Sequence, residues 1–160
     1  MSARTPSSPA AAMNRMYRYT RHVYDASRRY YLLGRDRMIR RVAERETGTV
    51  LEIGCGTARN LIQLHQHAPE LVLYGVDAAD VMIDTARRAI DRAGCTHRVQ
   101  LAQGVAQRFD ARTVFGRTEP FNVVVFSYVL SMIPDWAGAL DAALRHLQPG
   151  GRLYIVDFWD

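Results

Sequence analysis

The segment that most constrains the fold is Val50–Asn60, with the sequence VLEIGCGTARN. A short apolar run ends in two closely spaced glycines, Gly54 and Gly56, and a helix-compatible segment follows at once. Parallel strands deliver their carboxyl ends to nucleotide-like ligands in this way, because glycine lacks the Cβ that would keep a ligand away from the backbone. The segment therefore predicts a strand–loop–helix unit with a ligand site in its loop.

Two acids strengthen this prediction. Glu52 lies two residues before Gly54, and Asp77 ends a second apolar run, 21 residues after Gly56. An acid at the end of the neighbouring strand can accept hydrogen bonds from both hydroxyls of a ribose. The alternative for Asp77 is an acid that only caps a helix or closes a loop. The combination of a glycine loop with two such acids favours the ligand site.

Strands and helices alternate along the rest of the chain. This alternation predicts an α/β fold, with a doubly wound, Rossmann-like and mostly parallel sheet that carries helices on both faces. Asp135 is the expected N-cap of the last helix, and Gly94 is the expected stop of the helix before the third strand. The expected strands are 49–53, 71–76, 98–102, 121–126 and 152–157, and the expected helices between them are 58–67, 79–93 and 136–147.

Three regions are expected: a disordered tail at 1–12, a basic amphipathic helical cap at 13–48, and a ligand-binding domain at 49–160. In the cap, residues spaced three and four apart define one helical face up to Tyr31. Gly34 is expected to interrupt the helix, and a second helix over 35–46 is expected to bury one face. That face consists of Met38, Ile39, Val42 and Ala43.

The end of the chain suggests a truncated sheet. The sequence stops at Asp160, three residues after the last expected strand. That strand would then form an exposed edge, which is a liability for stability and aggregation. The family resemblance described below, whose members continue with two further antiparallel strands, implies that the chain is a fragment or a degenerate copy of a longer domain.

Positive charge is concentrated in the first third of the chain. All 21 basic residues are arginines, and residues 1–48 hold eleven of them with four acids, a net charge of +7 that leaves −2 for the remainder. In the plain interpretation these arginines are only solvated. The alternative is contact with anionic lipid head groups through an amphipathic helix. Nucleic-acid binding uses similar residues, but no recognition motif accompanies them, so we expect no nucleic-acid partner.

Cysteine and histidine usage gives no sign of a metal. Cys55 and Cys95 have neither disulfide nor metal spacing, and the five histidines show no ligand pattern.

The N-terminus MSARTPSSPAAA lacks the apolar core of a signal peptide, and the most apolar stretch, 121–133, is too short and too polar to span a bilayer. We expect a cytoplasmic protein, with membrane contact at most peripheral and on the inner face.

The glycine loop departs from the dinucleotide fingerprint, which needs a small residue where this chain has Arg59. It instead resembles motif I of the class I S-adenosylmethionine-dependent methyltransferases, which implies S-adenosylmethionine as cofactor. By this resemblance Glu52 helps to hold the loop and the amino group of the ligand, and Asp77 binds the ribose hydroxyls. Gly54, Cys55 and Gly56 would admit the methionine part.

The resemblance extends to the segments after the next strands. Met82 is where the family often packs an apolar side chain on adenine. Many members place an acid after the third strand, whereas this chain has no carboxylate at 103–105, so Gln103 or backbone groups would replace it. Ser127 either binds substrate or cofactor or only ends a strand. The further cofactor positions implied are Ala78, Met82, Gln103, Gly104, Val105 and Ser127.

Two longer stretches of the sequence resemble one particular group of enzymes within this family. YDASRRYYLLGRDRMIRRV at 24–42 and FSYVLSMIP at 126–134 are similar to the N-methyltransferases of betaine-lipid synthesis. This implies methylation of the amine of a polar lipid, foremost the conversion of diacylglyceryl-homoserine to diacylglyceryl-trimethylhomoserine, and the enzyme that makes the homoserine lipid as a partner. The alternatives are a phosphatidylethanolamine or small-amine N-methyltransferase, and a non-catalytic cofactor-binding fragment or accessory subunit.

Methyl transfer to an amine needs alignment and dehydration of the reactants rather than a strong general base. A free α-amino group has a pKa of about 8, so a neutral fraction is present near pH 7. Tyrosine rings and hydroxyls attract sulfonium and methylated ammonium groups. We therefore expect Tyr24, Tyr31 and Tyr128 to position the substrate; the alternative for each is core packing.

Overall fold

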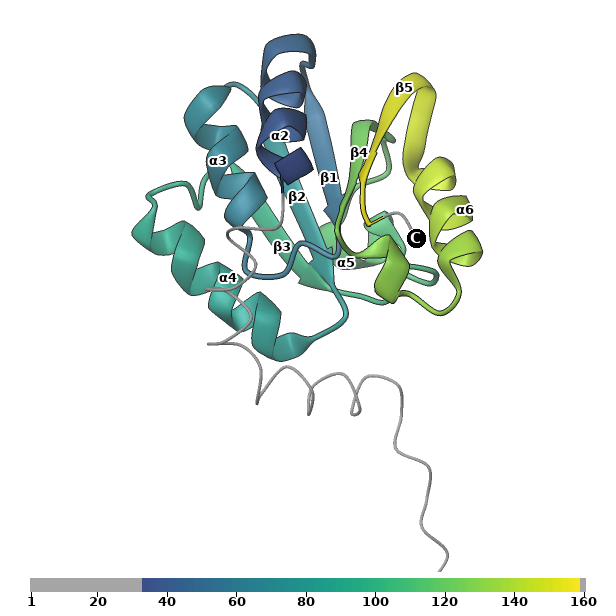
Figure 1. The fold of residues 1–160 in the computed structure, drawn as a ribbon. Helices are drawn as coiled ribbons and strands as arrows, with labels where there is room; N and C mark the ends of the chain where they lie inside the picture. Colours follow the sequence, from purple (N-terminus) through teal and green to yellow (C-terminus); the bar gives the residue numbers. More distant parts are fainter. Residues whose placement is uncertain (1–32, 159–160) are drawn as a thin grey trace, which may run out of the picture.

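Five parallel strands form one sheet in the order β3-β2-β1-β4-β5 (Figure 1). The computed structural model describes residues 33–158 of the chain. The expected tail at 1–12 and the first helix of the expected cap, with Tyr24 and Tyr31, lie outside these residues. The strands are β1 (Thr49–Ile53), β2 (Val72–Asp77), β3 (Val99–Gln103), β4 (Phe121–Ser127) and β5 (Leu147–Val156).

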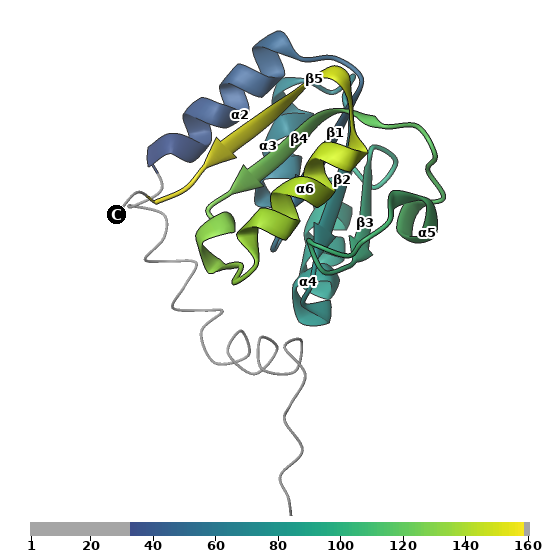
Figure 2. The same ribbon diagram turned by 90° about the vertical axis from the view of Figure 1, so that its right-hand side faces the viewer.

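Helices cover both faces of this sheet, as Figure 2 shows from the side of β5. One face carries α2 (Leu33–Arg45), α3 (Arg59–His67) and α4 (Asp80–Arg92). The other face carries α5 (Ala111–Phe115), the 3-10 helix η1 (Leu130–Met132) and α6 (Trp136–His146). The predicted doubly wound α/β fold is therefore confirmed.

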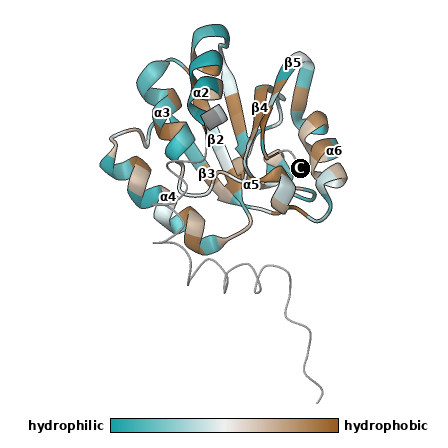
Figure 3. Cartoon of the chain, viewed as in Figure 1, coloured by the Kyte–Doolittle hydropathy of each residue, from teal (hydrophilic) through white to brown (hydrophobic). Residues whose placement is uncertain are grey.

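Two hydrophobic cores lie on opposite faces of the strands. Val123 and Val125 pack with α2, α3 and α4, whereas Val124 and Phe126 pack with α5 and α6. Because both faces are buried, each central strand reads as a continuous apolar run rather than an alternating one. The hydropathy colouring of Figure 3 shows the same division, with hydrophobic strands inside and hydrophilic outer turns on α2, α3 and α4.

Helix α2 packs against both α3 and β5. Met38, Ile39 and Val42 are buried as predicted, and Ala43 is partly buried against the same core. Gly34 was expected before this helix but lies in its first turn. A Cβ at Gly34 would approach a methyl group of Val156 to 2.5 Å, so only glycine lets α2 lie this close to β5.

Most element boundaries agree with the sequence prediction within two residues. Asp135 caps α6, since its side chain accepts a hydrogen bond from the backbone N–H of Gly138 at 3.0 Å. Gly94 follows α4 with a φ of +68°, which matches its predicted role as a helix stop.

The predicted start of the last strand is wrong. The prediction began at residue 152, but β5 begins at Leu147, which pairs with Phe121 before the register shifts at Val123. The backbone around Pro149 and the following glycines thus continues the strand through an irregularity. The sequence prediction also missed α5 and η1, because helices of five and three residues are too short to show a helical period.

A side-chain clamp joins the beginnings of β1 and β4. The Oδ1 atom of Asn122 accepts hydrogen bonds from the backbone N–H of Thr49 at 2.8 Å and from its hydroxyl at 2.9 Å. The Thr49 hydroxyl accepts in turn from the backbone N–H of Asn122 at 3.2 Å. Residues 73 positions apart are thereby held in register at the centre of the sheet.

We predict that Asn122→Ala lowers the free energy of unfolding by about 1–3 kcal/mol, because the part-buried N–H of Thr49 loses its acceptor. Urea denaturation followed by circular dichroism measures this loss. Asn122→Asp keeps an acceptor oxygen at the same position and serves as the control, with a smaller loss. An alanine variant as stable as the parent would show that the clamp does not hold the two strands.

Candidate functional site

The candidate site lies at the carboxyl ends of the strands, around the loops that follow β1 and β2. The chain places β2 and β3 on one side of β1, and β4 and β5 on the other. In open parallel sheets, ligands bind at the carboxyl edge where the strand order reverses in this way. The loop after β1 lies at this position.

Backbone geometry holds the loop after β1 in one conformation. The N–H groups of Gly54 and Cys55 both donate to the carbonyl oxygen of Val76, at 2.8 and 3.1 Å. Gly54 has a φ of +75°, and a Cβ there would collide with the side chain of Val129. Glycine is therefore required where the loops after β1 and β4 meet.

Two further residues of the loop adopt left-handed backbone conformations. Gly56 has a φ of +53° and open space around its Cα, and Ala58, just before α3, has a φ of +62°. For alanine this conformation costs about 1–2 kcal/mol. Because Ala58 carries a Cβ in this left-handed conformation, the backbone is strained there. The side chain is fully buried.

Asp77 connects this loop to the next strand and helix. One carboxylate oxygen accepts a hydrogen bond from the N–H of Gly56 at 2.9 Å, and the other accepts from the N–H of Ala79 at 2.9 Å. Desolvation raises the pKa of Asp77, and these two hydrogen bonds oppose that rise. Because each carboxylate oxygen has a second lone pair, Asp77 retains acceptors for a ligand.

Glu52 is the most deeply buried acid of the site. Its side chain is 2% exposed, and Asn60 of α3 donates a 2.5 Å hydrogen bond to Oε1. Desolvation raises the pKa of Glu52 to about 8, with a further increase from the charge of Asp77 and a decrease from Asn60. The Oε2 atom has no hydrogen-bond partner within residues 33–158. Glu52 therefore offers a buried carboxyl whose protonated form is favoured and whose Oε2 atom has no hydrogen-bond partner among the described residues.

Asn60 was not predicted from the sequence. It is 8% exposed, and its Oδ1 atom also lacks a hydrogen-bond partner in the described part of the chain. The available signal was its position in the first turn of the expected helix, eight residues after Glu52. A buried asparagine in that turn can reach back to the end of the preceding strand.

Cys55 contributes backbone rather than side-chain chemistry. Its thiol is buried in the core on the α3 side, and burial raises the pKa of the thiol well above its ordinary value. A Cβ added to Gly75 of β2 would lie 2.8 Å from the Cys55 sulfur, so the thiol points toward β2. The backbone of Cys55, and not its thiol, is therefore the part of this residue that lies at the candidate site.

The segments after β2 and β3 lie next to each other at the same edge. The Gln103 side-chain amide donates to the carbonyl oxygen of Ala78 at 3.2 Å, and the N–H of Gly104 donates to the carbonyl oxygen of Asp77 at 2.9 Å. Met82 is half-buried in the first turn of α4, and Val105 is exposed. The structure thus brings the predicted adenine-side positions to one edge.

Tyr128 and Ser127 end β4 on the other side of the loop. Tyr128 is buried, its φ is +52°, and its hydroxyl accepts a 3.3 Å hydrogen bond from the N–H of Gly34. Its ring centroid lies 4.9 Å from that of Phe158. The Ser127 hydroxyl is buried without a hydrogen-bond partner among the residues described. Tyr128 therefore ties the start of α2 to the site, and Ser127 has an unused polar group.

His146 has a structural role in α6. Its Nε2 atom accepts from the N–H of Ala111 at 3.2 Å, so Nδ1 carries the proton and lies 2.7 Å from the carbonyl oxygen of Ala142.

In the described part of the chain, no group of three or more His, Cys, Asp or Glu side chains could hold a metal ion. No helix described here has the length and hydropathy to cross a membrane.

The raised pKa of Glu52 predicts a stability that falls as the pH rises. The folded chain keeps a proton on Glu52 up to about pH 8, whereas the unfolded chain releases it near pH 4.5. The folded state therefore binds more protons in this window, and the free energy of unfolding decreases across it, by up to about 5 kcal/mol. Urea denaturation at a series of pH values measures the slope.

Glu52→Gln mimics the protonated carboxyl and should remove most of this slope. The control is Glu70→Gln, at an exposed position between α3 and β2, which should leave the slope unchanged. If Glu52→Gln has the same pH dependence as the parent, Glu52 does not carry the buried proton.

Comparisons with known proteins identify the family and the fold of the chain. Residues 19–160 match a family model described as a methyltransferase domain. A trans-aconitate 2-methyltransferase from Azoarcus sp. (strain BH72) is 30% identical over 118 residues, which cover 74% of this chain and 42% of that protein. A phosphatidylethanolamine N-methyltransferase from Cereibacter sphaeroides is 29% identical over 110 residues, which cover 69% of this chain and 50% of that protein.

A solved structure gives the same result for the fold. S-adenosylmethionine-bound CalS10, an amino pentose methyltransferase from Micromonospora echinaspora, superposes with a TM-score of 0.65 at 23% identity, covering 86% of this chain and 56% of that one. The chain spans about half the length of the curated relatives described above. Since the family model covers most of the sequence, the chain belongs to the methyltransferase-domain family and has the fold of the S-adenosylmethionine-dependent methyltransferases.

Proposed function

We propose that this protein is an S-adenosylmethionine-dependent N-methyltransferase that acts on the amine of a polar lipid, foremost diacylglyceryl-homoserine. The observation that carries the cofactor assignment is the pair of hydrogen bonds from the backbone N–H groups of Gly56 and Ala79 to the Asp77 carboxylate. These bonds bring a positive-φ glycine loop and the acid of the neighbouring strand together at the carboxyl edge of the sheet. This edge is where such folds bind nucleotide-like ligands.

The residues of the site fit this cofactor. Asp77 keeps acceptor capacity for ribose hydroxyls, and the unused Oε2 of Glu52 suits a cationic hydrogen-bond donor such as an amino group. S-adenosylmethionine, when bound, supplies a methyl group on a positively charged sulfonium. If Glu52 lost its proton next to the bound cation, the resulting carboxylate would attract that cation and stabilise the complex.

The protein residues near the end of β4 would align the amine. Ser127 offers a buried hydroxyl that can hydrogen-bond to substrate or cofactor, and Tyr128 is the next residue of the chain. The Tyr128 hydroxyl accepts a hydrogen bond from the N–H of Gly34, and the aromatic ring is the part of Tyr128 that we propose to attract a cation. No strong base is needed, because a neutral amine is itself the nucleophile.

A lipid substrate is supported by the arginines of α2 and by one relative. Helix α2 begins at the site and carries five arginines with two acids. The relative from Cereibacter sphaeroides is named a phosphatidylethanolamine N-methyltransferase. That name favours phosphatidylethanolamine as the second candidate substrate. In either case the enzyme would work from the cytoplasm at the inner face of the membrane.

The test is calorimetric titration of the 160-residue chain with S-adenosylmethionine, followed by methyl transfer to vesicle-embedded lipid amines. We expect binding near 1 μM, about −8 kcal/mol, with NADH giving no heat. Turnover of diacylglyceryl-homoserine, and not of phosphatidylethanolamine, supports the proposed substrate. The reverse result favours the second candidate, and binding without any turnover by a folded chain favours an accessory, non-catalytic role.

Asp77→Ala should weaken S-adenosylmethionine binding by about 1–3 kcal/mol, the loss expected for hydrogen bonds to a charged group. The same titration measures it. Because Asp77 also holds the loop, circular dichroism must show that the variant is folded. Asp84→Ala, which removes an exposed carboxylate from α4, is the control and should bind like the parent. Unchanged affinity in folded Asp77→Ala would remove Asp77 from the site.

A further inference from the structure

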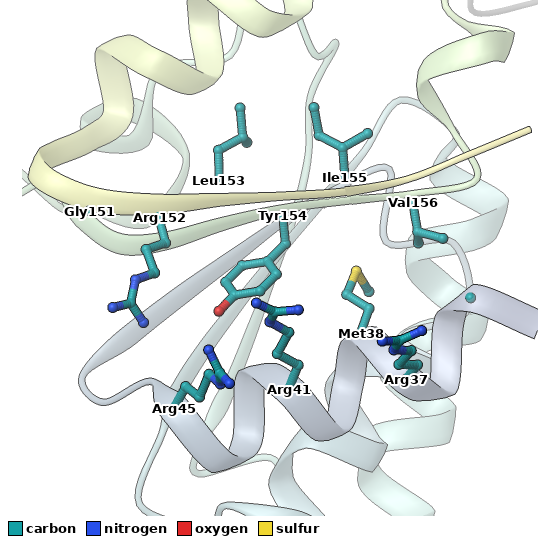
Figure 4. A pocket seen from close by; sticks show the side chains of 11 residues that line it. Arg37, Met38, Arg41, Arg45, Gly151, Arg152, Leu153, Tyr154, Ile155 and Val156 are labelled. Atoms are coloured by element: carbon teal, nitrogen blue, oxygen red, sulfur yellow. The ribbon is translucent and has the colours of Figure 1, made fainter. Parts of the chain in front are cut away.

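Arg35 is a nearly buried cation in the first turn of α2. Its side chain is 11% exposed, whereas the other arginines of this helix are exposed residues. The spacing explains the difference, because Arg35 precedes Ile39 by four residues and Val42 by seven and therefore shares their buried face. Arg41 and Arg45 instead lie on the side of the helix that faces β5 (Figure 4).

The first turn of α2 lies at the carboxyl edge of the sheet, next to the candidate site. The N–H of Gly34 donates a hydrogen bond to the hydroxyl of Tyr128, directly after β4. Helix α3 starts at the same edge, because it follows the loop after β1, and it packs beside α2 (Figure 1). Helical side chains lean toward the N-terminus of their helix, so Arg35 extends from α2 toward the loops at this edge.

The charge of Arg35 is only weakly compensated within the described part of the chain. The carboxylate within ion-pair distance is that of Asp36, whose Oδ1 atom lies 3.8 Å from Nε of Arg35, too far for a hydrogen bond. The Asp36 side chain is itself 61% exposed. The buried Nε atom of Arg35 has no hydrogen-bond partner among residues 33–158. A nearly buried guanidinium without a hydrogen-bonded acid is costly, so an anion bound beside it would stabilise the arrangement.

Buried oxygen atoms without described hydrogen-bond partners lie on the same face of the sheet. They include Oε2 of Glu52, Oδ1 of Asn60 and Oγ of Ser127. Glu52 is directed toward α3, where Asn60 contacts it. Ser127 continues the alternation of Val123 and Val125, which pack toward α2, α3 and α4. This edge therefore combines a cationic donor with several unused acceptors.

We propose that Arg35 is the residue of the candidate site that binds a carboxylate, and that this carboxylate belongs to an α-amino acid group. A guanidinium can bind a carboxylate through two parallel, charge-assisted hydrogen bonds. An α-amino acid group also carries an ammonium, whose N–H donors match the unused oxygen atoms of Glu52 and Asn60. A phosphate or a simple carboxylate would leave these acceptors unsatisfied.

Two molecules of the proposed reaction carry an α-amino acid group, so the inference rests on the proposed function. One is S-adenosylmethionine, through its methionine end. The other is diacylglyceryl-homoserine, through its head group. Phosphatidylethanolamine has no carboxylate beside its amine, so a role of Arg35 toward the lipid would also favour the homoserine head group over the second candidate substrate.

The first test is calorimetric titration of the full chain with S-adenosylmethionine and with its decarboxylated form. We expect Arg35→Gln to bind S-adenosylmethionine about 10- to 100-fold more weakly, as for the loss of hydrogen bonds between charged groups, and to bind the decarboxylated form as the parent does. The matched control, Arg40→Gln, removes the same charge from an exposed position of α2 and should bind both like the parent. Circular dichroism shows that the variants are folded.

The second test uses the lipid and needs no turnover. Co-sedimentation of the chain with phosphatidylcholine vesicles, with and without diacylglyceryl-homoserine, measures recognition of the head group. A loss in Arg35→Gln for S-adenosylmethionine alone assigns the carboxylate to the cofactor. Unchanged cofactor affinity with a comparable loss of binding to the homoserine-lipid vesicles assigns it to the lipid.

Equal losses for S-adenosylmethionine and its decarboxylated form would overturn the proposal, as would parent-like binding of both cofactor and lipid by Arg35→Gln. The parent also provides a test that needs no variant. If it prefers neither S-adenosylmethionine over the decarboxylated form nor the homoserine-lipid vesicles over plain ones, it recognises no carboxylate and the proposal is wrong. A folded parent that binds neither cofactor nor lipid contradicts the proposed function as well, whereas a binding parent with an unaffected Arg35→Gln contradicts this inference alone.

Discussion

The hydrogen bonds of the Asp77 carboxylate are the interaction on which the candidate site depends. They join the loop after β1, through Gly56, to the start of α4, through Ala79. The loop after β1 and the start of α4 are thus held around one acid that is itself partly removed from water. Since a ligand at this edge would contact the loop and the acid together, the same bonds that order the loop also shape the place where a ribose would lie.

The neighbouring acid, Glu52, shows the electrostatic cost of burying two carboxyl groups in this region. Glu52 is the last residue but one of the central strand; its side chain has a single described hydrogen bond, from Asn60, and its burial favours the protonated form. Two carboxyl groups close together in a desolvated region cannot both ionise cheaply. A cation bound between them would relieve that cost. The pair of acids is therefore electrostatically unfavourable at high pH.

The sequence was sufficient for the fold and for the segments that the structure brings together at the candidate site. Continuous apolar runs identified the strands because both faces of a parallel sheet are buried, and the acid and glycines marked the carboxyl edge. It could not reveal Asn60, whose importance comes from a contact between helix and strand. It also assigned Tyr128 a substrate role without its bond to Gly34, since that contact joins residues 94 positions apart. The start of β5 was missed because Pro149, Gly150 and Gly151 are residue types that favour turns over strands.

The central position of β1 has a consequence for how the chain acquires its structure. β1, β2 and β3 come first in the sequence and are adjacent in the sheet, so they can pair through contacts of moderate range. The opposite edge of β1 can pair only after β4 has been synthesised, and Asn122 of β4 lies 73 residues beyond Thr49. During synthesis an apolar strand edge therefore stays open while more than half of the described chain emerges. Contacts of this range slow folding, and this interval is when the nascent chain most needs protection from aggregation.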